Sequence, residues 1–331
     1  MNFKRILKWP ALPSLALLLL FVVLNCIVSE GFATASAWLG FLLTVTPIVI
    51  IAIGQAVVII GGGIDISLGA TVSLVNVIMA TTSGFNGPVA KPVILALLAG
   101  MLIGALNGFL VAVLRISPLL VTFAVSYIAS GLALTILPIP GGGVPLGMVD
   151  WYNYNVLGFI PMVVILIVLC YLLWFFWNKS PYGTHLYALG NNVNKAYFSG
   201  IDVTKIQFMT YVFAGLMAGI AGIALSSNIG AGDARVGNAM TLSSVAACVI
   251  GGISLAGGFG SVFGAIFGTL FLNLVLVTVM GLGVPAYYQD LVSGVIILFG
   301  IFAAVIVGRR RQAKERARIK LEGDAMAKKA S

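Results

Sequence analysis

The residues that could carry bond chemistry are few in this chain. His185 is the single histidine, and no acidic partner or metal-ligand spacing accompanies it, so we interpret it as an ordinary loop residue. Cys26, Cys170 and Cys248 lie in apolar runs without disulfide or metal spacing, which favours buried small hydrophobic side chains. No GxxxxGK[ST] phosphate loop is present. We therefore expect no catalytic residue, no metal site and no ATP bound through such a loop.

Asp65 is the one carboxylate that lies inside or at the edge of an apolar stretch. Charges at such positions are costly and often functional, so Asp65, with Gly61, Gly62 and Ser67, is a candidate for the substrate path or its gate. A structural role is the alternative. Asp65 precedes Ile66 and could cap the following helix, with Ser67 satisfying nearby backbone groups.

The elements that must position these residues are membrane spans. The chain is 60% hydrophobic and 8% charged, whereas a soluble domain carries about 25% charged residues. We therefore predict an all-α polytopic membrane protein that forms one transmembrane domain, residues 11–308, between a short N-terminus, residues 1–10, and a basic tail, residues 309–331. The net charge of +9 is clustered at the two ends and mid-chain. This placement fits membrane orientation better than nucleic-acid binding.

A span needs about 20 apolar residues, and the sequence predicts about ten. The third and eighth are short and flanked by glycine. The predicted ranges are 11–29, 38–60, 66–81, 91–114, 117–137, 157–177, 207–227, 241–256, 258–280 and 288–308.

The positive-inside rule sets the expected orientation. A cytosolic N-terminus places every Lys and Arg on the cytosolic side except Lys91 and Arg235. The basic tail must then also be cytosolic, where it would set topology and attract anionic lipid. This requires an even number of spans.

The longest polar interruption, residues 178–207, is expected to lie on the cytosolic side. Asn191 and Asn192 could cap a helix, residues 193–199 read as about two turns, and Gly200 fits the left-handed stop after it. Tyr197 and Phe198 would then be presented without a core to bury them. They would form either a docking knob for another protein or aromatics that lie back on the bilayer interface.

The opposite side carries a segment rich in Pro, Gly and aromatics, residues 138–155, with Trp151, Tyr152 and Tyr154. These side chains suit an aromatic belt at the membrane interface. A platform on which an extracytoplasmic partner docks is the alternative.

Two glycine stretches share a pattern: AVVIIGGGIDISL at 56–68 and AACVIGGISL at 246–255. Such similarity can mark a duplicated half, but both stretches cross in the same direction by our span count, so we treat the repeat as weak. The glycines at 257, 258, 260, 264 and 268 show Gly-xxx-Gly spacing, which predicts close helix packing.

Three motifs together resemble the permease subunits of ABC importers, in the carbohydrate branch of the ribose, galactose and xylose type. They are GGGIDISLGA (61–70), YALGNNVNKAYFSGIDVTKIQ (187–207) and VIGGISLAGGFGSVFGAIFG (249–268). The resemblance covers nearly the whole chain in the right order.

The resemblance implies a dimer of permeases, homodimer or heterodimer, in the bacterial inner membrane with both termini cytosolic. A cytosolic ABC ATPase, often with two fused ATP-binding halves, would bind ATP and Mg²⁺. A periplasmic or lipid-anchored binding protein would deliver the sugar. The coupling segment of the family falls on residues 187–207 here, with these candidate residues: Gly190, Asn191, Val193, Ala196, Tyr197, Phe198, Ser199, Gly200 and Ile201.

This chain departs from the usual coupling motif at three places. The family pattern has a second glycine before the asparagine and an acidic residue before paired alanines. Here Asn191 is followed by Asn192, and Lys195 and Tyr197 flank Ala196. The departures suggest a partner ATPase with a locally adjusted surface.

We therefore predict a pore-forming, non-catalytic subunit that imports a monosaccharide by alternating access. The same machinery with a nucleoside, a branched-chain amino acid or a furanosyl signal molecule as cargo is an alternative. An ion-coupled secondary transporter is a further one, although no series of buried acids or histidines offers an ion relay.

Overall fold

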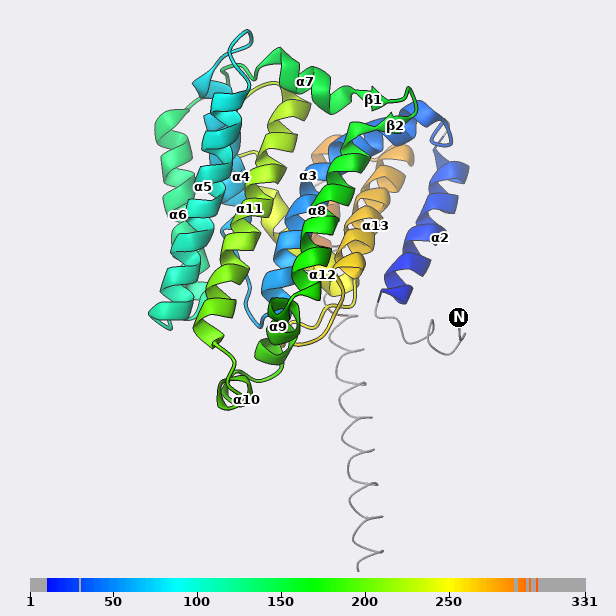
Figure 1. The fold of residues 1–331 in the computed structure, drawn as a ribbon. Helices are drawn as coiled ribbons and strands as arrows, with labels where there is room; N and C mark the ends of the chain where they lie inside the picture. Colours follow the sequence, from blue (N-terminus) through cyan, green and yellow to red (C-terminus); the bar gives the residue numbers. More distant parts are fainter. Residues whose placement is uncertain (1–10, 30, 289–290, 296–297, 299–301, 303–331) are drawn as a thin grey trace, which may run out of the picture.

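The computed structural model describes residues 11–29, 31–288, 291–295, 298 and 302, and it shows a helical membrane protein (Figure 1). Six helices are long and apolar enough to cross a membrane: α3 (Ala35–Ile60), α5 (Ala90–Gly108) with its π-helical end η1 (Phe109–Val113), α6 (Pro118–Ile136), α8 (Met162–Lys179), α11 (Val203–Ile229) and α13 (Val262–Gly281). Three shorter apolar helices join them: α2 (Leu12–Val28), α4 (Leu68–Thr82) and α12 (Asn238–Ile250).

These helices confirm the predicted all-α class and match the first nine expected spans. The tenth, at 288–308, lies largely outside the described residues, as do residues 1–10 and 309–331. The remaining elements lie at the two ends of the bundle. They are α7 (Leu146–Asn153), β1 (Asn155–Val156) and β2 (Ile160–Pro161) at one end, which we call the α7 end, and α9 (Pro181–Asn191) and α10 (Val193–Phe198) at the other, the α10 end (Figure 1). The short 3₁₀ helix η2 (Ala286–Tyr288) follows α13.

Helices α3 and α11 form the core. The sequence of α3 is apolar on every side, as expected of a helix surrounded by protein, and 89% of its most apolar window is buried. Helix α11 packs on α5 through small residues. A Cβ atom on Gly104 of α5 would lie 3.0 Å from the Cα of Gly215, so these two backbones touch as small-residue helix contacts allow.

Helices α4 and α12 are too short to cross a bilayer. Their 15 and 13 residues give about 22 and 20 Å, against about 30 Å of hydrocarbon. Each is preceded by an irregular segment, residues 61–67 and 230–237, which completes the path. Irregular backbone at this depth is tolerated only where protein or water covers it.

Side chains of α4 hold the second irregular segment. The Asn76 amide nitrogen donates to Ser226 Oγ at 2.9 Å and to the Ala231 carbonyl at 3.0 Å, and its oxygen accepts from the Asp233 N–H at 2.7 Å. Ser73 Oγ accepts from the Gly237 N–H at 2.9 Å. The polar residues of α4 therefore replace the helical partners that residues 230–237 lack.

The two helix–segment–helix units run in opposite directions. The first unit, α3 to α4, turns at the α10 end, where the Ile60 carbonyl accepts from the Gly258 N–H. The second, α11 to α12, turns at the α7 end, where Gly232 pairs with Gly141. Inverted units are frequent in transporters. The glycine stretches do not mark this relation, because both lie at the α10 end, after α3 and after α12.

Two local predictions were wrong, and a third holds only in part. Cys26 is exposed on α2, whereas Cys170 and Cys248 are buried as expected. Tyr152 is fully buried and its hydroxyl donates to the Leu43 carbonyl at 2.7 Å, so it pins α7 to α3 and does not belong to an aromatic belt. In the last glycine run, Gly264 and Gly268 do pack tightly on α12, but the three earlier glycines form a turn with positive φ.

Candidate functional site

Helix α10 is built from local capping signals. Asn192 accepts from the Lys195 N–H at 2.9 Å through its side chain, as an N-cap does. Gly200 has φ of +78°. The Ile201 N–H donates to the Ala196 carbonyl and the Gly200 N–H to the Tyr197 carbonyl, which is the bonding of a Schellman stop. The predicted short helix and its glycine stop are confirmed, and of the two asparagines Asn192 is the cap.

The exposed side of α10 is aromatic. Tyr197 is 65% and Phe198 85% exposed, and Val193 is 48% exposed. The two rings touch edge to face, 5.8 Å between centroids, while Ala196 is buried beneath them. Asn191, Ser199 and Gly200 are also exposed, and Ile201 is half-buried. A rigid apolar knob that no described residue covers is the kind of surface that binds another protein.

The base of α10 is helix α9, which the sequence analysis does not predict within residues 178–207. Leu186 and Leu189 are buried, and the Tyr187 hydroxyl donates to the Gly260 carbonyl at 3.1 Å. The signal for α9 was present, because Leu186, Leu189 and Gly190 recur at helical spacing behind Pro181 at the first helical position. Helix α9 thus fastens the knob to the bundle (Figure 1).

Gly190, the penultimate residue of α9, lies where the end of α3 meets the glycines at 257 and 258. The Gly258 N–H donates to the Ile60 carbonyl at 2.9 Å, and a Cβ atom on Gly190 would overlap that same carbonyl oxygen. A Cβ on Gly257 would lie 2.8 Å from the Cα of Gly62. Three backbones therefore touch without intervening side chains. We call this contact of residues 60–62, 190 and 257–258 the glycine junction.

Asp65 and Ser67 lie in the interior. Asp65 is 1% exposed, and its Oδ1 accepts from the Ser67 N–H at 2.8 Å and from Ser67 Oγ at 2.6 Å. Asn107 of α5 donates to Ser67 Oγ at 2.7 Å. The carboxylate thus holds the turn that leads into α4, although no side-chain hydrogen bond caps that helix. Gly61 is buried and Gly62 is exposed beside Gly190.

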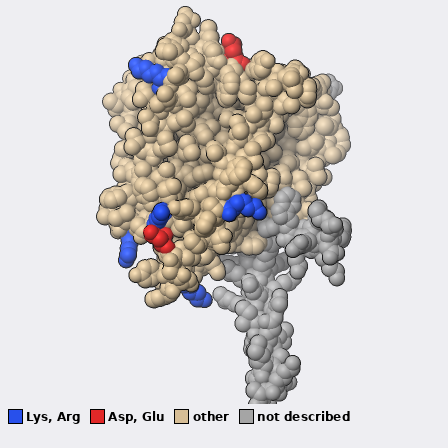
Figure 2. All heavy atoms as spheres, in the orientation of Figure 1, with Lys and Arg blue, Asp and Glu red and all other residues tan. Residues whose placement is uncertain are grey.

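The described charges gather near α10. Arg115, Lys179, Lys195 and Lys205 are all exposed at the α10 end, with Asp202 among them (Figure 2). At the α7 end lie Lys91, near the start of α5, and Asp150 in α7. The side that bears the knob is therefore the basic side. Among the described residues, no group of three or more His, Cys, Asp or Glu side chains could hold a metal ion.

Comparison with known proteins places the chain in a family. Residues 37–301 match the family described as branched-chain amino acid transport system / permease component. The ribose import permease of Bacillus subtilis is 34% identical over 91% of this chain and 93% of its own length. The autoinducer 2 import system permeases of Photorhabdus temperata and Escherichia coli K12 are each 28% identical over 80% of this chain and 81% and 83% of their own lengths. No solved structure matches.

The family match spans most of the chain, and the ribose relative aligns over more than nine-tenths of both chains. Both agree with the three motifs and with the apolar helices of the fold. The chain belongs to the branched-chain amino acid transport system / permease component family and is a membrane-spanning permease subunit.

Proposed function

We propose that this chain forms, with a second permease copy, the translocation pathway of an ATP-driven importer for a monosaccharide of the ribose type. A separate ABC ATPase binds ATP and Mg²⁺ and grips α10. A periplasmic or lipid-anchored binding protein delivers the sugar on the opposite side. The chain itself makes and breaks no bonds, and the cavity between the permeases changes the side that it faces.

The observation that carries this proposal is the path from α10 to the spans. The knob stands on α9, and Gly190 of α9 touches the backbone that ends α3 and the backbone that follows α12. Close-packed contacts of this kind transmit displacement because no flexible side chain absorbs it. A movement of the ATPase against Tyr197 and Phe198 therefore reaches one helix of each inverted unit.

The names of the relatives support a sugar as the transported solute. One relative is named for ribose import and two for autoinducer 2 import, while the family description names branched-chain amino acids. The ribose relative has the higher identity and covers more of this chain, so D-ribose is the first solute to test. Autoinducer 2, the furanosyl signal molecule among the alternatives, is the second.

The basic side is the cytosolic side in this proposal. Four exposed Lys and Arg residues surround α10, and the positive-inside rule places such clusters in the cytosol. In the bacterial inner membrane, this orientation brings the knob to the cytosol, the compartment that holds ATP.

The test removes the two rings of the knob. The variant Tyr197→Ala/Phe198→Ala should bind the partner ABC ATPase at least thirtyfold more weakly, because two exposed aromatic anchors contribute about 2 kcal/mol or more. ATP-driven D-ribose uptake into proteoliposomes should fall in parallel. Affinity is measured by titration of the ATPase onto the permease in nanodiscs.

The matched control is Leu157→Ala/Phe159→Ala in the β1–β2 hairpin, whose side chains are 77% and 73% exposed at the α7 end. This variant should bind the ATPase as the unmodified chain does. Equal ATPase affinity of the knob variant and the control would contradict the docking role of α10.

A further inference from the structure

Helix α12 begins about halfway through the bundle. Its first residues contact the start of α4: the Gly237 N–H donates to Ser73 Oγ and Thr241 Oγ1 accepts from the Gly69 N–H at 3.0 Å. Further along α4, Val75 packs against Gly222 of α11. With 1.5 Å per residue, these contacts place Gly69 about 20 Å along the roughly 40 Å length of α11. The start of α12 therefore lies near the middle of the membrane.

This start is open on one side. Asn238 and Ala239 are exposed, Leu242 is 65% exposed, and no side chain caps the helix. The N–H groups of Asn238 and Met240 donate to the Arg235 and Gly237 carbonyls, whereas that of Ala239 has no partner within the described residues. A helix N–H group needs a partner, and hydrocarbon supplies none. The first turn of α4 at the same depth is buried instead. The exposed face of α12 therefore meets water or a polar solute.

Arg235 enters the same region from the segment before α12. It is exposed, and its backbone N–H donates to Asp233 Oδ1 at 2.8 Å. Its guanidinium has no ion pair or hydrogen bond within the described part of the chain. A charged group inside the membrane is costly and faces a bundle interior or a water-filled cavity. Arg235 and the start of α12 thus point to one aqueous surface.

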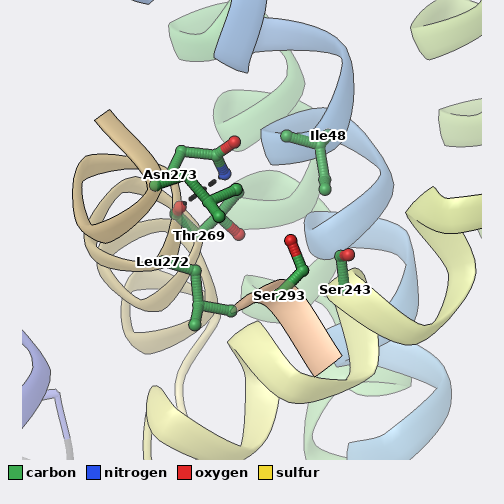
Figure 3. Close-up of a pocket in the computed structure, with 7 residues that line it drawn as sticks. Ile48, Ser243, Thr269, Leu272, Asn273 and Ser293 are labelled. Atoms are coloured by element: carbon green, nitrogen blue, oxygen red, sulfur yellow. Dashed lines mark hydrogen bonds between the residues drawn. The ribbon is translucent and has the colours of Figure 1, made fainter. Parts of the chain in front are cut away.

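A pocket continues this surface (Figure 3). It lies between α3, α12 and α13 and is small, with a cavity volume of about 40 Å³. Its polar lining consists of hydroxyl and amide groups from Ser243, Thr269, Asn273 and Ser293, beside apolar Ile48, Leu272 and Leu276. Asn273 donates to the Thr269 carbonyl at 2.9 Å. No lining residue is charged.

We propose that the exposed start of α12, with Arg235 and the adjoining pocket, is the surface of this chain over which the solute passes, and that it suits a polyhydroxylated solute. The proposal rests on the proposed function and deepens it. Hydroxyl and amide groups both donate and accept, as sugar hydroxyls do, and apolar side chains cover the carbon faces.

This surface differs from the earlier candidates. Asp65 and Ser67 are buried and fully engaged in the turn before α4, so they act as positioning residues for that turn. The solute surface is at the start of α12, which corresponds in the second unit to the start of α4. The start of α12 is exposed, whereas the start of α4 is buried.

The test measures thiol reactivity in the assembled complex in lipid nanodiscs, where both faces are accessible. With Cys26, the exposed cysteine, replaced by Ser, Asn238→Cys should react with the charged reagent sulfonatoethyl methanethiosulfonate at least tenfold faster than Leu102→Cys. Leu102 is 68% exposed on α5, in the stretch where Gly100 and Gly104 touch α11 near its middle, so it samples lipid at matched depth.

Reaction of Asn238→Cys no faster than Leu102→Cys would overturn the proposal, because lipid or a second permease copy would then cover the surface. Ala239→Cys repeats the measurement if Asn238→Cys does not assemble. A solute path also requires reactivity at Ser243→Cys that changes at least threefold between nucleotide-free and ATP-vanadate states, and an equal rate in both states would assign the surface to a static crevice.

The two proposals fail separately. Absence of ATP-driven uptake of D-ribose and of autoinducer 2 by the unmodified complex would remove the proposed function. Slow reaction of Asn238→Cys in a complex that does take up solute would remove only the inference drawn from α12.

Discussion

At the scale of single residues, Gly190 explains why a coupling segment can act on two helices at once. It is buried against the hydrogen bond between the Gly258 N–H and the Ile60 carbonyl, and only a residue without a Cβ atom fits there. Because glycine has no Cβ atom, the three backbones can approach one another to contact distance.

Gly190→Ala should therefore separate the glycine junction. The added methyl group has no space, and overpacking of this kind costs about 1–3 kcal/mol. We expect a lower thermal unfolding midpoint in detergent. We also expect fewer D-ribose molecules imported per ATP hydrolysed, with uptake and hydrolysis measured together in proteoliposomes.

Gly131→Ala is the matched control, because a Cβ atom on Gly131 of α6 would meet no atom within 4 Å. This variant should be neutral or slightly more stable, as Ala favours helix over Gly by about 1 kcal/mol. A Gly190→Ala variant that behaves like it would show that the junction tolerates expansion.

Prediction from sequence succeeded where the cause is local. Asn192 and Gly200 act on their own neighbours, so the cap and the stop of α10 could be read from the chain. The role of Gly190 could not, because its constraint comes from Ile60 and Gly258, which are far away in sequence. The sequence leaves two roles open for Asp65, and the structure shows that its bonds to Ser67, which Asn107 also contacts, hold the turn.

At the scale of elements, the irregular segments beside α4 and α12 are the main departure from ten regular spans. The short third and eighth spans were recognised by their length and flanking glycines. Their depth was not, because hydropathy reports that a segment is apolar and not where along the membrane normal it begins. Asn76 supplies the polar contacts that make residues 230–237 stable inside the bundle.

Asn76→Ala should destabilise this unit strongly. It leaves the Asp233 N–H and the Ala231 carbonyl without their partner, and unmade buried hydrogen bonds cost about 1–3 kcal/mol each. We expect a loss of about 2–4 kcal/mol in reversible unfolding in mixed micelles, and proteolysis at residues 230–237 should become faster.

Asn153→Ala serves as the comparison, since Asn153 is exposed and bonds only within α7, to the Val149 carbonyl. Its effect should stay within about 0.5 kcal/mol. If both asparagine variants unfolded alike, residues 230–237 would owe their position to backbone pairing alone.

At the scale of the whole molecule, the basic α10 end and the less charged α7 end define a direction across the membrane. The class, the family and nine helices of the described chain agree with the sequence-based expectations, because hydropathy and charge bias are summed over many residues. The opposite course of the two helix–segment–helix units escaped prediction, because the matching glycine sequences lie on one side of the molecule.

Topology can be measured directly. Asn194→Cys next to the knob should react with an impermeant maleimide only after inner-membrane vesicles are turned inside out, and Leu157→Cys in the β1–β2 hairpin should react in intact spheroplasts. The reverse pattern would place α10 outside the cell and would remove any role for a cytosolic ATPase there.

Backbone hydrogen bonds at the α7 end join residues 141–144 to residues 230–232, and we call this contact the seam. The seam has a thermodynamic consequence. Gly141 and Gly232 exchange two backbone hydrogen bonds of 2.9 Å, and the Val144 N–H donates to the Gly230 carbonyl at 3.2 Å. At about 0.5–1.5 kcal/mol net for each bond, parting this seam costs about 1.5–4.5 kcal/mol. A ligand shifts a two-state equilibrium from one extreme to the other with about 5.5 kcal/mol. A partner that binds at the α7 end with about this difference in free energy between the two states is thus enough to separate the two segments.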